Sequence, residues 1–244
     1  MTSTGYNISP KSNVSCFMSA GDGIISAEGR NVELRTNQSD NKDEWILIPE
    51  NDLSLIALPE SYDRTSFFDS VISELSSIGY SNCYDNEETI DKGVTSGELV
   101  GRMANSKITV IRTHGSKTAI ETSDGTLTRA NINSMPSTVF SSSELIIYGA
   151  CLTGSGRAGA ANLVNATHSH GCQIVIGFEE EVWNTEVNEW CDAFFQALVD
   201  GKTVLEACSA ADKHIIDNWY DPERPYEVRT DSWYIAGDSS ATFT

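Results

Sequence analysis

Short apolar runs alternate with amphipathic segments along most of the chain. Uninterrupted apolar runs predict buried strands, because strands covered on both faces of a parallel sheet are apolar throughout. Such runs lie at 53–58, 108–111, 145–148 and 173–177. Elsewhere apolar residues recur every three or four positions, which predicts helices, and these segments lie at 67–78, 187–198 and 204–215. Strands that alternate with helices predict an α/β fold with a mostly parallel sheet and helices on both of its faces.

Weaker patterns predict the smaller elements. Asp124-Gly125 sits between two alternating segments within 117–128, which indicates a hairpin with a two-residue turn. Thr203 and Glu206 have the spacing of a capping box at the start of a helix. Further segments predict a strand at 80–84, short helices at 96–103 and 157–167, and a closing strand at 233–236.

The first 50 residues differ in character from the rest of the chain. They are rich in Asn, Ser, Gly and Asp and contain short alternating runs such as 31–35, which predict short strands and turns. The buried strands begin only after Pro49. We therefore predict a β-rich N-terminal segment over 1–50 and one α/β domain over 51–244.

Two of the predicted strands run into reactive residues. The run 108–111 leads to Arg112-Thr113-His114-Gly115, and the run 145–148 leads to Gly149-Ala150-Cys151. Parallel strands present their carboxyl ends at one edge of the sheet, and neighbouring strands lie about 4.8 Å apart. An imidazole beside a thiol favours the nucleophilic thiolate. The pattern predicts cysteine-dependent acyl transfer, most often peptide hydrolysis.

Charge narrows the set of partners. The chain has 16 Lys and Arg against 35 Asp and Glu, a formal charge of −19. Nucleic acid is therefore not an expected partner, whereas a cationic peptide would be attracted; alternatively the charge serves only solubility.

No apolar run approaches the ~18 residues of a membrane span, and the first residues lack signal-peptide features. This indicates a cytoplasmic protein or a fragment of a longer secreted one. The six scattered cysteines do not suggest a disulfide framework.

These motifs, in this order, resemble the caspase-like cysteine peptidases. The resemblance rests on Thr113-His114-Gly115, the hairpin that follows and 148–151. After Cys151 the chain is similar to the CHAT branch, with the bacterial gingipain and clostripain types as relatives, through 171–177, Trp183-Asn184, 200–207 and 234–238. The resemblance implies an α/β/α sandwich and a thiol protease without a cofactor. It implies His114 as general base and acid, Cys151 as nucleophile, and an oxyanion hole made by the backbone N–H groups of Gly115 and Cys151.

The N-terminal segment resembles one repeat of a ricin-type β-trefoil lectin. The similarity covers Tyr6-Asn7-Ile8, 29–36 and 41–47 with Trp45. One repeat cannot bury its own apolar face, and three or more are usually needed. The segment is therefore expected to be part of a truncated module, or a set of strands that pack on the peptidase domain.

Acidic residues flank two strands that should end near the reactive pair. Glu179, Glu180 and Glu181 follow the strand at 173–177, and Asp231 precedes the closing strand. Any of them could hold a basic side chain of a substrate, which predicts cleavage after Arg or Lys. The rival is cleavage after Asp with Arg64 as the carboxylate partner, and the simplest alternative is that the glutamates face water.

Other functions fit the sequence less well. A zinc site at His168, His170 and Cys172 lacks a visible fourth ligand, and the acidic loop 85–91 does not have the spacing of an EF-hand. A nucleotide-binding domain is disfavoured because its glycine fingerprint is missing. The main alternative to a peptidase is a catalytically silent caspase-like scaffold for protein interaction.

Overall fold

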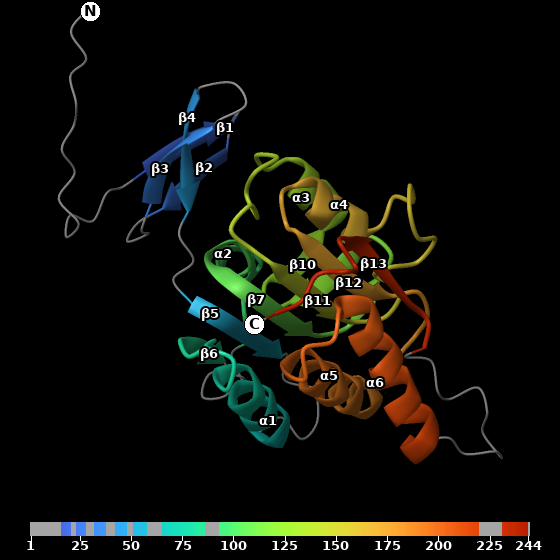
Figure 1. The fold of residues 1–244 in the computed structure, drawn as a ribbon. Helices are drawn as coiled ribbons and strands as arrows, with labels where there is room; N and C mark the ends of the chain where they lie inside the picture. The colour runs from blue at the N-terminus through green and yellow to red at the C-terminus, as the bar shows by residue number, and fades with distance from the viewer. Residues whose placement is uncertain are drawn as a thin grey trace, which may run out of the picture.

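A six-stranded, mostly parallel sheet organises the computed structural model of the chain (Figure 1). The structure describes residues 16–20, 23–27, 32–37, 42–47, 51–57, 65–85, 93–219 and 231–243. The strand order is β13-β12-β11-β7-β5-β6. Every pairing in this sheet is parallel except that of β13, the closing strand, which runs antiparallel to β12. The sheet therefore has the topology that the alternation of strands and helices predicts.

The main sheet contains the four long apolar runs of the sequence. Its strands are, in chain order, β5 (Asn51–Ala57), β6 (Cys83–Asp85), β7 (Ser106–Arg112), β11 (Leu145–Gly149), β12 (Ile174–Phe178) and β13 (Trp233–Gly237). The helices are α1 (Thr65–Ser76), α2 (Ser96–Asn105), α3 (Arg129–Asn133), α4 (Leu163–Ser169), α5 (Asn184–Val199) and α6 (Val204–Trp219). A small sheet of β8 (Gly115–Ser116), β9 (Ala119–Thr122) and β10 (Gly125–Thr128) follows β7 directly.

Side-chain alternation along each strand divides the interior into two apolar layers. Ile108, Val110, Leu145 and Ile147 belong to the layer under α1, α5 and α6, whereas Ile111 and its neighbours in the sheet belong to the layer under α2, α3 and α4. Figure 1 shows these two groups of helices on opposite faces of the sheet. Because side chains alternate with period two, the last residues of the strands, Arg112 and Gly149, face the α5 side, where they meet Asn188 and Val187.

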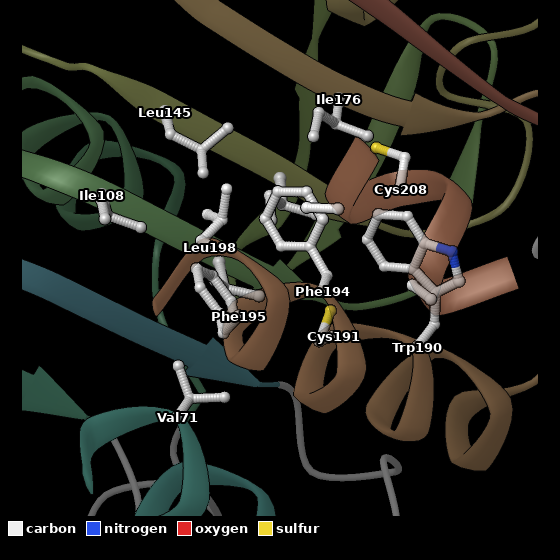
Figure 2. Packing of buried hydrophobic residues seen from close by; sticks show 14 of the residues in the cluster. Val71, Ile108, Leu145, Ile176, Trp190, Cys191, Phe194, Phe195, Leu198 and Cys208 are labelled. Atoms are coloured by element: carbon white, nitrogen blue, oxygen red, sulfur yellow. The ribbon is translucent and has the colours of Figure 1, made fainter. Parts of the chain in front are cut away.

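An aromatic stack on α5 fills the first of these layers (Figure 2). Trp190 stacks on Phe194 with ring centroids 5.1 Å apart, and it meets Phe178 of β12 edge to face. Cys191 and Cys208 lie in the same layer, fully buried, as the sequence predicts. This packing fixes α5 against the sheet, and α5 begins beside the carboxyl ends of β7 and β11.

The structure differs from the sequence-based prediction at three local points. The hairpin turn is Ser123–Asp124 rather than Asp124-Gly125, because Gly125 already pairs with Thr122. The helix expected over 157–167 is α4, which begins only at Leu163, since Arg157 and Gly159 have positive φ and Asn162 caps the helix. Helix α3 and strand β8 are not anticipated by the apolar pattern.

The predicted capping box of α6 is present: the Thr203 N–H donates to Glu206, and the Glu206 N–H donates to Thr203.

The N-terminal segment contains two β-hairpins within its described residues. Strand β1 (Cys16–Ala20) pairs with β2 (Gly23–Ala27), and β3 (Val32–Asn37) pairs with β4 (Lys42–Leu47). The other residues that carry the lectin resemblance, among them Tyr6-Asn7-Ile8, lie outside the described residues, as does most of the acidic loop 85–91. The boundary near residue 50 remains a prediction. No helix among the described residues is long and apolar enough to cross a bilayer.

Three partly buried carboxyl groups near α5 and α6 predict that mild acid stabilises the fold. Burial, reinforced by the charges of Asp192 and Asp200, raises the pKa of Glu74 to about 7. Burial also raises the pKa of Asp192 and of Asp212 to about 6 each. A pKa raised by folding contributes stability below the unfolded-state pKa, and this contribution is lost as pH rises through the folded-state pKa. We therefore expect a higher Tm at pH 5 than at pH 8 in thermal unfolding.

The matched variant for this prediction is Asp192→Asn, which removes one of the three titrations and one repulsion on Glu74. It should narrow the difference in Tm between pH 5 and pH 8. A Tm that increases from pH 5 to pH 8 in the unsubstituted chain would contradict the prediction.

Candidate active site

Parallel register brings the two reactive residues to one edge of the sheet. Arg112, the last residue of β7, is paired with Gly149, the last residue of β11. His114 and Cys151 each follow two residues later, so they leave adjacent strands at the same level. The Cys151 side chain is half-buried and His114 is exposed, which keeps the pair accessible to a substrate.

The small sheet fixes the backbone of His114. The Glu121 N–H donates to the His114 carbonyl at 3.0 Å, and the Thr113 hydroxyl donates to the Glu121 carbonyl at 3.1 Å. The first of these bonds ties the His114 backbone to β9, and the next residue, Gly115, is paired with Ile120 in the small sheet.

Gly115 lies directly against the segment that carries the cysteine. A Cβ placed on Gly115 would lie 2.8 Å from the Ala150 Cβ and 2.9 Å from the Cys151 carbonyl oxygen. Both distances are shorter than any ordinary contact, so the position requires the absence of a side chain. The predicted His114-Gly115 and Ala150-Cys151 segments are thus in contact, as an oxyanion hole shared between them requires.

The turn after Cys151 is strained and is held by β12 and the loop beyond it. Leu152 has a φ of 63°, a conformation that costs a non-glycine residue about 1–2 kcal/mol. Its N–H donates to the Glu180 carbonyl at 3.0 Å, and the Gly154 N–H donates to the Phe178 carbonyl at 2.8 Å. A Cβ on Gly154 would meet the Gly177 carbonyl oxygen at 2.6 Å. Close backbone contact between the two segments therefore determines where the cysteine stands.

A buried arginine ties the start of α5 to the same edge. Arg112 is fully buried, and its Nη1 donates to Oδ1 of Asn188 on α5. A Cβ on Gly149 would lie 2.9 Å from Cγ1 of Val187, so the first turns of α5 pack directly on the end of β11. Glu186, in the first turn of α5, is also buried. These contacts fix the first turns of α5 against the carboxyl ends of β7 and β11.

The predicted acidic residues lie at this edge, but they are not equivalent. The Glu179 N–H donates to the Ser232 carbonyl at 2.6 Å, which brings the loop 179–181 alongside the start of β13 and its neighbour Asp231. Glu179 forms an ion pair with Arg157 at 2.6 Å, so its charge is already compensated. Glu180, Glu181 and Asp231 are exposed. These three carboxylates therefore lie at the surface, where a substrate could reach them.

The other candidate cysteine and histidines have structural roles. His168 and His170 each place Nδ1 within hydrogen-bond distance of a backbone carbonyl, those of Cys172 and Ala166. Burial raises the pKa of the Cys172 thiol, and that of the Cys191 thiol, to about 12, so neither is a nucleophile near neutral pH. Among the residues the structure describes, no group of three or more His, Cys, Asp and Glu side chains could hold a metal ion.

Two features of the segment before α5 are not predicted from the sequence. The Val182 N–H lies 3.5 Å from the Cys151 Sγ. Trp183, which the sequence suggests only as a helix start, is 62% exposed and is the most exposed large apolar side chain among the described residues. An aromatic residue two positions after three glutamates is the signal in the sequence for an exposed apolar side chain in this segment.

Comparison with known proteins identifies the fold. No protein-family model matches the chain, and no curated protein matches it. Among solved structures, the Arg-specific cysteine proteinase gingipain R aligns with 16% identity and a TM-score of 0.61, over 80% of this chain and 49% of its own. A complex of the pro- and mature domains of Porphyromonas gingivalis RgpB aligns with 15% identity and a TM-score of 0.62, over 79% and 48%.

The chain spans about half the length of these gingipain structures. At such identities the likeness shows the fold alone, and it confirms the fold class expected from the sequence. The described α/β domain has the mostly parallel sandwich fold of the caspase-like cysteine peptidases.

Proposed function

We propose that the chain is a cysteine endopeptidase in which His114 and Cys151 form the catalytic dyad. The observation that carries this proposal is the register of β7 and β11, by which His114 and Cys151 each follow the end of one of two adjacent strands, with Gly115 packed against Ala150 and Cys151. The motifs that resemble the CHAT branch support the same assignment.

The chemistry follows from these positions. His114 accepts the thiol proton of Cys151, and the thiolate attacks the carbonyl carbon of the scissile bond. The N–H groups of Gly115 and Cys151 donate to the oxyanion that forms. His114 then gives its proton to the leaving amine, which leaves a thioester on Cys151. Water, deprotonated by His114, hydrolyses the thioester and regenerates the thiol.

The substrate class we propose is a peptide or protein with a basic residue before the cleaved bond. Glu180, Glu181 and Asp231 are exposed in the segments that follow β12 and precede β13, so their carboxylates can be reached by a substrate. The formal charge of −19 would also attract cationic substrates, with an effect that weakens as ionic strength increases. The similar gingipain R is named as Arg specific, which is consistent with this proposal.

Matched fluorogenic peptides that differ only in the residue before the cleaved bond test this proposal. We expect the peptides with Arg and Lys to be cleaved at least about tenfold faster than those with Asp or a neutral residue, in keeping with about 1.4 kcal/mol or more from a charge-assisted contact. Iodoacetamide should block cleavage. A preference for Asp would exclude the basic pocket, and complete inactivity together with slow alkylation of Cys151 would favour the scaffold alternative.

A further inference from the structure

The sulfur of Cys151 has a backbone partner that lies outside the proposed dyad and oxyanion hole. The Val182 N–H donates to Sγ at 3.5 Å, and the thiol donates to the Val182 carbonyl at 3.6 Å. Both distances are within the range of hydrogen bonds to sulfur. One residue of the loop between β12 and α5 thus contacts the reacting atom through both of its backbone groups.

The surroundings of Val182 keep this residue in place. Its side chain packs against the apolar layer under α5. On one side, Glu180 accepts from the Leu152 N–H at 3.0 Å. On the other side, Trp183 caps α5, and its carbonyl accepts from the Val187 N–H at 3.0 Å. The segment is therefore fixed both to the cysteine turn and to a long helix, and the Val182 N–H cannot drift from the sulfur without breaking these contacts.

The two contacts respond in opposite ways when the thiol loses its proton. The thiolate can no longer donate to the Val182 carbonyl, but it becomes a stronger acceptor for the Val182 N–H, since hydrogen bonds to an ionised group are shorter and stronger. The N-terminus of α5, which has no side-chain cap and begins two residues later, adds a partial positive charge on the same side. Both effects favour the ionised sulfur.

We propose that the backbone N–H of Val182 is a third donor of the active site, one that stabilises and orients the Cys151 thiolate. This inference rests on the proposed function for its purpose, because the thiolate is the nucleophile there. The proton released by Cys151 goes to His114, and Val182 keeps its own proton throughout. Its role is distinct from that of the Gly115 N–H, which serves the substrate oxygen rather than the sulfur.

The direct test removes this N–H with Val182→Pro, and Val182→Ala serves as the control that keeps it. The readout is the rate of Cys151 alkylation by iodoacetamide as a function of pH, followed by mass spectrometry on protein shown to be folded by thermal unfolding. Loss of a hydrogen bond to the charged form disfavours that form. We expect Val182→Pro to lower the rate of Cys151 alkylation at a fixed acidic pH about tenfold, and Val182→Ala to leave this rate close to that of the unsubstituted chain.

A second measurement needs no substitution at Val182 and covers the case in which the proline variant does not fold. In the unsubstituted protein, the amide ¹H and ¹⁵N chemical shifts of Val182 should titrate with the same midpoint as the alkylation rate, and this titration should vanish in Cys151→Ala. A folded Val182→Pro variant with an unchanged alkylation profile would overturn the inference. So would a Val182 amide that does not titrate, or that titrates equally in Cys151→Ala. Because neither readout requires peptide cleavage, an inactive protein would refute the proposed function without deciding this inference.

Discussion

Replacing Cys151 by alanine is expected to lower peptide hydrolysis at least about 10³-fold, because the residual rate then comes only from substrate binding and the oxyanion donors. His114→Ala should be nearly as damaging, since the thiol loses its base and the leaving amine loses its acid. The combined variant should be little worse than either one, because the two residues act in the same step. Initial rates with the best peptide of the matched set measure all three.

The fold should survive these changes. Cys151 is half-buried and His114 is exposed, so truncation removes little packing. Cys191→Ala provides the matched control: its side chain is fully buried in the apolar layer, and its loss should lower the Tm while leaving catalysis in place. If Cys151→Ala or His114→Ala retained most of the turnover, the dyad would be wrong.

The sheet is the part of this molecule that sequence predicts best. Strands such as β7 and β11 are buried on both faces, so their apolar runs stand out without any alignment. The order of strands and helices then restricts the topology, since parallel neighbours need crossovers. From this alone His114 and Cys151 could be expected at one edge of the sheet, and the observed pairing of Arg112 with Gly149 brings them there.

Local turns were harder to predict, because long-range contacts override residue preference. Leu152 and Arg157 adopt positive φ, which their side chains disfavour. In Leu152 the conformation is held by a hydrogen bond from its N–H to the Glu180 carbonyl, 28 positions further along the chain. Nothing in the apolar pattern around 152–162 reports such contacts, so the helix now seen as α4 was expected several residues too early.

The polar partners of individual residues could not be predicted from the sequence either, because they also depend on long-range contacts. The three consecutive glutamates look equivalent in the sequence, yet the fold gives Glu179 an ion pair with Arg157 and leaves Glu180 and Glu181 exposed. The Val182 N–H is a still clearer case. A backbone group has no sequence signature of its own, and its contact with the Cys151 sulfur arises only because the loop before α5 folds against the cysteine turn.

Replacing Gly115 by alanine is expected to lower kcat/KM by about 10²–10³-fold, the effect of losing or misplacing one oxyanion donor. The new Cβ would lie 2.9 Å from the Cys151 carbonyl oxygen and 2.8 Å from the Ala150 Cβ. Both atoms belong to the segment after β11, whose backbone is held by hydrogen bonds to β12 and the loop after it. The steric clash must therefore displace the Gly115 N–H, the turn that contains Cys151, or both. Overpacking of this kind also costs stability, typically about 1–3 kcal/mol.

Two comparisons separate loss of the oxyanion donor from general damage. The first is Gly97→Ala, at a helix position where an added Cβ meets nothing within 4 Å; this variant should keep full activity and gain up to about 1 kcal/mol of stability. The second is the alkylation of Cys151 in Gly115→Ala. Alkylation requires the thiolate but no oxyanion, so its rate should fall far less than kcat/KM. Equal losses in both rates would assign the damage to the dyad itself, and an unchanged kcat/KM would remove Gly115 from the oxyanion hole.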